Sequence, residues 1–381
     1  MPRKTLVPSS FATVVALTLS LLLAPGPAAA AAPPTPAPSG DGWPASAAHD
    51  PALDLARVRA LEAKVADGSF KQITSVMVVH DGKPVYEHYF GDTDAQTLHD
   101  VRSATKSITA LLAGIAIDRG LLGGVDDRVY DRFPEFTAAH PVDPRLRATT
   151  LADLLTMSTL WECDDENPFS SGNEERMYVT EHWLDFVLAL PVKGFAPWMK
   201  KPQDSPFGRS FAYCTGASFV AGAMIERATG QALARFAEQA LERPLDIAQS
   251  HWNTSPEGIG MGGGGTRYRT RDLAKFGQLV VDGGRWRGRQ VVSPGYVQAM
   301  TTPHAQADDD AEYGYQWWRL HFDVDGRDVA VWAMSGNGGN YVFAWPERHL
   351  VAVVTSTAFN RNFAHQQSRQ LFRDHVLAAL R

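Results

Sequence analysis

The short segment Ser103-Ala104-Thr105-Lys106 constrains the fold and the chemistry of this chain more than any other feature. It spells S-x-x-K, and the apolar run Ser107–Ile117 follows directly, which predicts a buried helix beginning at the motif. On a helix, residues three apart share a face, so the Ser103 hydroxyl and the Lys106 amine can meet. A serine hydroxyl becomes a nucleophile when a base takes its proton, and a desolvated lysine can be that base. The motif therefore predicts a nucleophilic serine; the alternative is an amphipathic helix with a surface lysine.

The N-terminus has the features of a secretory signal peptide. A basic start precedes the apolar stretch Phe11–Leu23, which is too short to span a membrane comfortably. Ala-x-Ala sites end at Ala30 or Ala32, so we expect residues 1–32 to be removed on export. The alternative is an uncleaved anchor. Cleavage near Ala30 or Ala32 would place the mature protein outside the cell or in the periplasm.

The mature chain is expected to be a linker followed by one folded domain. Residues 33–50 are rich in Pro, Ala, Ser and Gly and are expected to be disordered. Residues 51–381 carry helical and strand patterns, with a helical subdomain at about 145–255. No later stretch is apolar enough for a transmembrane helix.

Composition and motifs argue against several classes of function. The formal net charge of −6 offers no case for nucleic-acid binding. The chain contains no P-loop, no dinucleotide fingerprint and no H-E-x-x-H, and its 12 histidines lack ligand spacing. We therefore expect no cofactor, no metal, no nucleic-acid partner and no stable membrane span, and a monomer acting on a small molecule.

The chain has two cysteines, Cys163 and Cys214. In an exported protein, an even pair indicates one disulfide. The alternative is two buried free thiols.

Strand patterns near both ends of the chain flank a helical middle. The strands are expected at Ile73–Val79, Pro84–Phe90, Tyr315–Phe322, Asp328–Met334, Tyr341–Trp345 and Leu350–Thr357. The helices are expected at Leu53–Val65, Thr150–Met157, Glu181–Leu190, Ser218–Thr229, Ala232–Leu241, Thr270–Val280 and Asn362–Leu380. The simplest α/β assembly is one mainly antiparallel sheet built from both termini, flanked by the N- and C-terminal helices, with a largely helical second domain.

In the order of its motifs, the chain resembles the serine β-lactamase and penicillin-recognising superfamily. More narrowly, it is similar to the class C branch, with its esterases and 6-aminohexanoate-dimer hydrolases, over roughly residues 55–378. The first motif is S-x-x-K; the second, Y-x-N, is present as Tyr213-Cys214-Thr215. The third, K-T-G, is replaced by Ser335-Gly336-Asn337-Gly338-Gly339, and Gly262–Phe276 looks like a shared signature. The resemblance implies a β-lactamase-like fold.

The resemblance also implies an acyl-enzyme mechanism. Ser103 would attack a carbonyl, Lys106 would accept its proton directly or through Tyr213, and Tyr213 would protonate the leaving group. The oxyanion would be held by the backbone N–H of Ser103 and a donor from the strand around Ser335. The small residues Ser335–Gly339 suit a strand against which the substrate lies closely, so these five residues are the predicted substrate strand. The alternatives are a core aromatic at Tyr213 and a plain glycine hairpin at residues 336–339.

Two departures from the class C pattern bear on the substrate. Thr215 stands where class C enzymes have Asn, and no Lys or Arg lies between Asp328 and Pro346 to hold a carboxylate. We therefore predict an exported serine hydrolase for an uncharged amide or ester. The alternatives are a carboxylesterase or D-amino peptidase of the same fold, a class C β-lactamase, and a penicillin-binding sensor that acylates without turnover.

The loop Trp161–Asn167 is acidic, with Glu174 and Glu175 close behind. At the rim of a cleft it would attract an amine-bearing substrate; the alternative is a solvated acidic loop. Trp161 and the pair Trp317-Trp318 are candidates for lining an apolar cleft.

Overall fold

The computed structural model describes residues 40–47 and 49–381. The predicted signal peptide, residues 1–32, lies outside the described residues. Part of the predicted linker is described, and it is packed rather than free. The Trp43 side chain is 4% exposed, donates from Nε1 to the carbonyl of Arg271, and meets Trp286 edge to face. Ordered packing therefore begins before residue 51, because Trp43 has an apolar site to fill.

An antiparallel sheet of eight strands organises the described chain, in the order β2-β1-β12-β11-β10-β9-β8-β7. Its strands are β1 (Ile73–His80), β2 (Lys83–Tyr89), β7 (Ala305–Asp308), β8 (Ala311–Tyr313), β9 (Trp318–Val324), β10 (Arg327–Gly336), β11 (Asn340–Trp345) and β12 (Leu350–Ser356). Short ladders join β3 (His99–Asp100) to β4 (Arg267–Tyr268) and β5 (Arg285–Trp286) to β6 (Arg289–Gln290). Because β1 pairs with β12, the two ends of the chain build one sheet, which confirms the predicted fold class.

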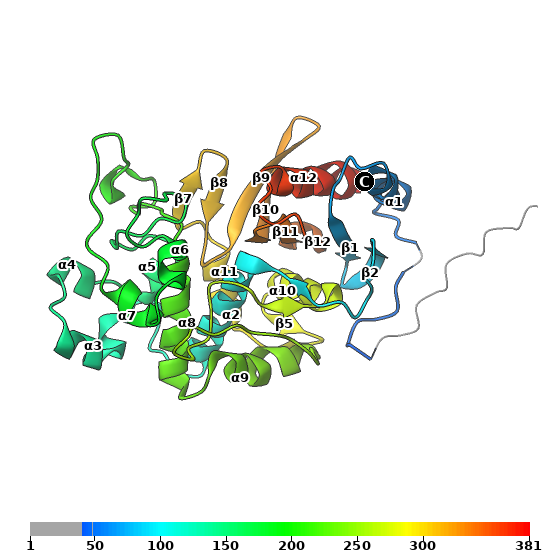
Figure 1. Cartoon of the computed structure of the whole chain (residues 1–381). Coiled ribbons are helices and arrows are strands. Elements are labelled where there is room, and N and C mark those ends of the chain that lie inside the picture. The colour runs from blue at the N-terminus through cyan, green and yellow to red at the C-terminus, as the bar shows by residue number, and fades with distance from the viewer. Residues whose placement is uncertain (1–39, 48) are drawn as a thin grey trace, which may run out of the picture. The chain divides into compact units, whose positions relative to one another are not determined.

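Helices cover both faces of this sheet and fill the middle of the chain (Figure 1). They are α1 (Leu55–Ala66), α2 (Thr105–Asp118), α3 (Pro134–Ala139), α4 (Pro144–Arg147), α5 (Leu151–Leu155), α6 (Glu174–Tyr178), α7 (Trp183–Leu188), α8 (Thr215–Thr229), α9 (Leu233–Ala237), α10 (Thr270–Val281), α11 (Pro294–Met300) and α12 (Ala364–Leu371). The edge strand β7 and its neighbour β8 have no clear strand pattern in the sequence, because they are short and only weakly apolar.

The two faces of the sheet belong to different apolar clusters. Helix α1 and the turns after α12 pack on one face, where Val58 meets strand residues such as Val76 and Val78. Helices α2 and α10 pack on the other, with the alternate strand residues, among them Met77. That second cluster continues into α5 and α8, so the helical middle shares a core with the sheet. The first residues of α2 consequently lie at the junction of the sheet and the helical middle.

Helix α10 carries a buried ion pair at the centre of this packing. The side chains of Lys275 and Asp272 are both 0% exposed, and Lys275 Nζ lies 2.9 Å from Asp272 Oδ1. Arg269 Nε donates to the other carboxylate oxygen at 2.6 Å. Burial lowers the pKa of Lys275, and the Asp272 carboxylate opposes that shift. The Asp272 carboxylate therefore contacts two cations in a largely buried environment, and Asp41 adds a weaker attraction to both.

We expect Asp272→Asn to lower the free energy of unfolding by about 3–5 kcal/mol, because it leaves a buried ammonium without its counter-charge. Urea denaturation at neutral pH measures this. The control is Asp143→Asn, at an exposed carboxylate that pairs with Arg145 and should leave the denaturation midpoint unchanged. Equal denaturation midpoints for the two variants would contradict the expectation that Asp272 stabilises the fold through the buried ion pair.

Candidate active site

Ser103 and Lys106 meet as the S-x-x-K motif predicts. Ser103 lies in a 3₁₀ turn, Arg102–Ala104, that leads directly into α2, and Lys106 lies in the first turn of that helix. Lys106 Nζ is 3.1 Å from Ser103 Oγ, and the lysine residue is 1% exposed. Burial of the amine next to the hydroxyl gives the serine a base within hydrogen-bond reach.

The other contacts of Lys106 orient its amine. Nζ lies 2.6 Å from the carbonyl oxygen of Gly263 and 3.0 Å from Thr215 Oγ1. A neutral amine has two N–H bonds and one lone pair, and a carbonyl oxygen only accepts. In the neutral form that a general base requires, the two N–H bonds would be directed to Gly263 and Thr215, and the lone pair would face the Ser103 hydroxyl.

The turn that carries Ser103, the predicted nucleophile, is called the nucleophile turn and is held in an uncommon backbone conformation. Arg102 has φ of +50°, in the left-handed region that non-glycine residues rarely adopt. Its carbonyl accepts hydrogen bonds from Thr105 Oγ1 at 2.7 Å and from the N–H of Gly265 at 3.2 Å. These two bonds compensate the strain and tie the glycine segment to the nucleophile turn.

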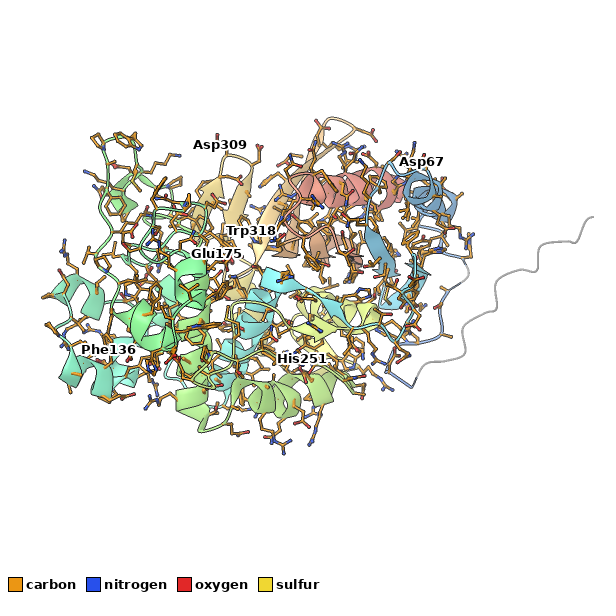
Figure 2. The ribbon with its side chains drawn as sticks, viewed as in Figure 1. Asp67, Phe136, Glu175, His251, Asp309 and Trp318 are labelled. Carbon is orange, nitrogen blue, oxygen red and sulfur yellow. A yellow bond between two sulfur atoms is a disulfide. The ribbon has the colours of Figure 1, made fainter. Side chains whose placement is uncertain are left out.

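Tyr213 lies beside Lys106, and it is the tyrosine ring, not the hydroxyl, that contacts the amine. Lys106 Nζ is 4.9 Å from the centroid of the Tyr213 ring, a cation–π distance. The Tyr213 ring also stacks on Trp318 of β9, which is labelled in Figure 2; the two ring centroids are 5.9 Å apart. Within residues 40–47 and 49–381, no hydrogen bond joins the Tyr213 hydroxyl to another residue. Its part in proton transfer stays a prediction.

The end of β10 approaches the nucleophile turn through a glycine. A Cβ on Gly336 would lie 2.0 Å from the carbonyl oxygen of Val101 and 3.1 Å from the amide nitrogen of Ala104. Pairing of β10 with β9 ends at Ala333, opposite Trp318, so the last residues of β10 have no β9 partner. A substrate can lie along this edge, close to Ser103.

The remaining residues of the predicted substrate strand have structural partners. Gly338 and Gly339 have φ of +89° and +80°, as the turn from β10 to β11 requires. The Asn337 amide donates to Asn360 Oδ1 at 2.6 Å and accepts the N–H of Asn360 at 2.8 Å. Asn337 therefore holds the loop after β12, and the hairpin interpretation describes residues 338–339.

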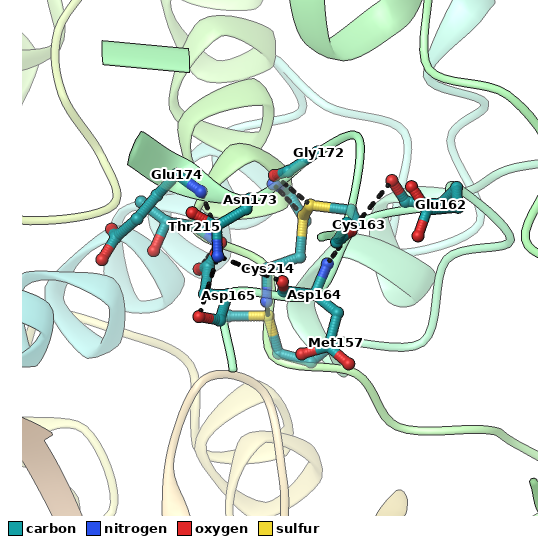
Figure 3. Close-up of a disulfide and its surroundings, with 12 residues drawn as sticks. Met157, Glu162, Cys163, Asp164, Asp165, Gly172, Asn173, Glu174, Cys214 and Thr215 are labelled. Atoms are coloured by element: carbon teal, nitrogen blue, oxygen red, sulfur yellow. Dashed lines mark hydrogen bonds between the residues drawn. A yellow bond between two sulfur atoms is a disulfide. The ribbon is translucent and has the colours of Figure 1, made fainter. Parts of the chain in front are cut away.

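The predicted disulfide is present. Cys163 and Cys214 are bonded, with their Cα atoms 5.5 Å apart (Figure 3). Cys214 is the N-cap of α8 and stands between Tyr213 and Thr215. The bond therefore fastens the acidic loop to the segment that carries two neighbours of Lys106.

The carboxylates of the acidic loop accept backbone N–H groups, both within the loop and from neighbouring segments. Asp165 accepts the N–H of Thr215, Asp164 accepts the N–H of Glu166, and Glu162 accepts the N–H of Ser171. These bonds fold the loop against α8 and α6.

Two of the three candidate tryptophans lie away from any cleft. Trp161 is 0% exposed and donates from Nε1 to the Tyr130 hydroxyl, and Trp317 is also 0% exposed. Both fill the core. Trp318 alone of the three is partly exposed, beside Tyr213.

Sequence reasoning missed three residues of this site. The Gly263 carbonyl contacts Lys106, Asp165 lies behind Thr215, and Arg102 stacks on Phe359 with its guanidinium carbon 4.4 Å from the ring centroid. The run of glycines from Gly262 is the signal that could have indicated a close backbone approach. No local pattern could show which partner it approaches.

Neither a metal site nor a membrane helix is evident in the described part of the chain. No group of three or more His, Cys, Asp or Glu residues there could hold a metal ion. No helix there is both long and apolar enough to cross a bilayer.

Comparison with known proteins gives consistent results. The sequence model of the Beta-lactamase family matches residues 61–376. A 6-aminohexanoate-dimer hydrolase from Paenarthrobacter ureafaciens is 23% identical over 283 residues, which are 70% of each chain. Among solved structures, EstCE1, a hydrolase with promiscuous acyltransferase activity, superposes with a TM-score of 0.64 at 16% identity, covering 83% of this chain and 97% of that one. A class C β-lactamase from Rhodobacter sphaeroides gives 0.62 at 16% identity, with 84% and 99% covered. At these identities the structures show the same fold.

The disulfide should support activity more than it supports the fold as a whole. It closes a segment of 51 residues in sequence separation, worth about 4 kcal/mol in the chain-entropy model. We expect the double variant Cys163→Ser, Cys214→Ser to stay folded at 25 °C and to lose activity, because the Tyr213–Thr215 segment is released. Activity and circular dichroism along one urea titration measure the two losses. Coincident loss of both signals would contradict this expectation.

Proposed function

The chain belongs to the Beta-lactamase family, and from this we propose that it is a serine hydrolase that cleaves a small amide or ester through an acyl-enzyme on Ser103. The observation that carries the proposal is the contact of the buried Lys106 amine with Ser103 Oγ at 3.1 Å, while Thr215 and Gly263 occupy its other hydrogen-bonding directions.

Acylation follows from that geometry. Ser103 Oγ forms a bond to the carbonyl carbon of the substrate as its proton passes to Lys106. The tetrahedral oxyanion is stabilised by the backbone N–H of Ser103 and by an N–H from the end of β10, which lies against the same turn. The leaving amine or alcohol departs with a proton from Lys106 or from Tyr213. Water then attacks the acyl-enzyme, and its proton returns by the same route.

The surroundings of Ser103 favour a substrate without a carboxylate at the β10 side. No Lys or Arg lies on β10 or β11 after Asp328. Arg102, which precedes Ser103 in the sequence, forms an ion pair with Asp100 at 3.5 Å and stacks on the Phe359 ring. The paired rings of Tyr213 and Trp318 offer an apolar wall for an acyl chain or leaving group.

The curated relative is a 6-aminohexanoate-dimer hydrolase, which supports an amide bond as the target. A carboxylesterase or D-amino peptidase of this fold would use the same residues. A penicillin-binding sensor is the candidate from another class. Burst kinetics distinguish it from a hydrolase, because a sensor releases one equivalent of product and then stops.

The disulfide supports an oxidising compartment, outside the cell or in the periplasm. Export through the segment at residues 1–32, with cleavage near Ala30 or Ala32, belongs to the same proposal. N-terminal sequencing of the protein recovered from culture medium or periplasm tests it.

We expect Ser103→Ala to lower kcat/KM for any turned-over ester by at least roughly 10³-fold, with an unchanged melting temperature, because the nucleophile is absent. A labelled fluorophosphonate should react with the wild type and fail to react with this variant. Ser69→Ala, at an exposed serine in the loop after α1, is the control and should be labelled normally. Covalent labelling of the Ser103→Ala variant would refute the proposal.

The missing cation predicts slow turnover of β-lactams. We expect kcat/KM for a p-nitrophenyl short-chain ester to exceed that for nitrocefin, whose carboxylate has no lysine to meet it on β10. Steady-state kinetics with both substrates at one pH decides the matter. A large preference for nitrocefin would indicate a β-lactamase instead.

A further inference from the structure

Asp165 contacts both residues that flank Cys214. Its Oδ2 accepts the N–H of Thr215 at 2.6 Å, and its own N–H donates to the carbonyl of Tyr213 at 2.8 Å. Its Oδ1 accepts the N–H of Glu174 at 2.9 Å (Figure 3). With the disulfide two residues before it, Asp165 fixes the backbone on each side of Cys214.

Through Thr215, these contacts connect Asp165 to Lys106, the proposed base. Thr215 is the first residue of α8, and its hydroxyl is the 3.0 Å partner of Lys106 Nζ. The N–H that Asp165 accepts is one of the unpaired donors at a helix start. The Asp165 carboxylate is the acceptor of this N–H within the described residues, so its removal would leave the N–H unpaired.

We propose that Asp165 is a positioning residue for catalysis: its carboxylate holds the Tyr213–Thr215 segment so that Thr215 and the Tyr213 ring stay on Lys106. This inference rests on the proposed function, and it assigns to one member of the acidic loop a task other than attracting substrate.

The ionisation of Asp165 makes the inference testable. Burial raises the pKa of its carboxyl to about 6; Lys106 opposes this shift, Glu174 adds to it, and the hydrogen bonds from Thr215 lower it. The charged or titratable groups that face it are Lys106 from α2 and Glu174 and Tyr178 from α6. Protonation converts one of the two carboxylate oxygens, each of which accepts an N–H, into a hydroxyl, which is a weaker acceptor. The hydrogen bond to one of the two N–H groups therefore weakens below this pKa.

The test measures how fast a fluorophosphonate labels Ser103 at pH 5 to 8. In this reaction Ser103 Oγ bonds to phosphorus, fluoride leaves, and the hydroxyl proton passes to Lys106. We expect the wild-type rate to fall through an inflection near pH 6. Asp165→Asn should lack that inflection and be about tenfold or more slower at pH 8, a loss of the size that misplacement produces. Near pH 5 the two rates should converge.

The matched control is Asp54→Asn. Asp54 also accepts N–H groups at a helix start, that of α1, which packs on the far face of the sheet. Asn is an equally good N-cap, so this variant should follow the wild type at every pH. Asp165→Glu keeps a titrating carboxyl that is one methylene too long, and we expect it to retain the inflection at a lower rate.

A second measurement does not depend on activity. A carboxyl with a higher pKa in the folded chain than in the unfolded one favours folding less as pH rises between the two values, here from 3.8 to about 6. The melting temperature of the wild type relative to Asp165→Asn should therefore fall over that interval.

The outcomes separate the two proposals. A wild type that is not labelled at Ser103 refutes the proposed function and this inference with it. Labelling of Asp165→Asn at the wild-type rate from pH 5 to 8 refutes the role of Asp165 alone. If Asp165→Asn does not fold, a wild-type profile without an inflection, or Asp165→Glu labelled as fast as the wild type, overturns the role.

Discussion

The rest of the site depends on one buried amine. Lys106 is almost fully enclosed, and an amine without water must find acceptors in the protein. It finds them in three separate segments: the nucleophile turn, the start of α8 and the glycine-rich stretch before β4. The same three contacts that satisfy the buried amine also bring it to Ser103 Oγ, the geometry on which the proposed function depends.

That arrangement requires backbones to approach more closely than side chains allow. A Cβ on Gly263 would lie 2.8 Å from Thr215 Cγ2, and a Cβ on Gly336 would overlap the Val101 carbonyl. The glycines let the carbonyl of residue 263 and the end of β10 reach the helix start directly. The third motif can lose its lysine and still keep this geometry, because here the packing depends on the small residue.

The turn at Tyr213 is neither helix nor strand, and contacts with the acidic loop hold it in place. The disulfide, the Asp165 carboxylate and the Asp165 N–H all bind within three residues of one another. The partly exposed Trp318 of β9 stacks on the Tyr213 ring. A loop distant in sequence thereby contacts the segment that carries two neighbours of Lys106, and the proposed role of Asp165 depends on this contact rather than on the attraction of a substrate.

The sequence alone determined the elements with long apolar runs and the contacts that are local. The helix after Ser103 follows from an apolar run. The pair β1 and β2 follows from an apolar, β-branched segment and a second strand pattern on either side of the turn residues Asp81-Gly82, and the meeting of Ser103 with Lys106 follows from a three-residue spacing. The cysteine pair was predictable because no other partner exists in the chain. Tertiary structure decided the rest: that Gly263 and Thr215 are the partners of Lys106, that Asn337 binds Asn360, and that Trp161 is core while Trp318 is at the site. These are contacts between residues far apart in the chain, and their choice depends on how the sheet and the helical middle pack, which no local pattern records.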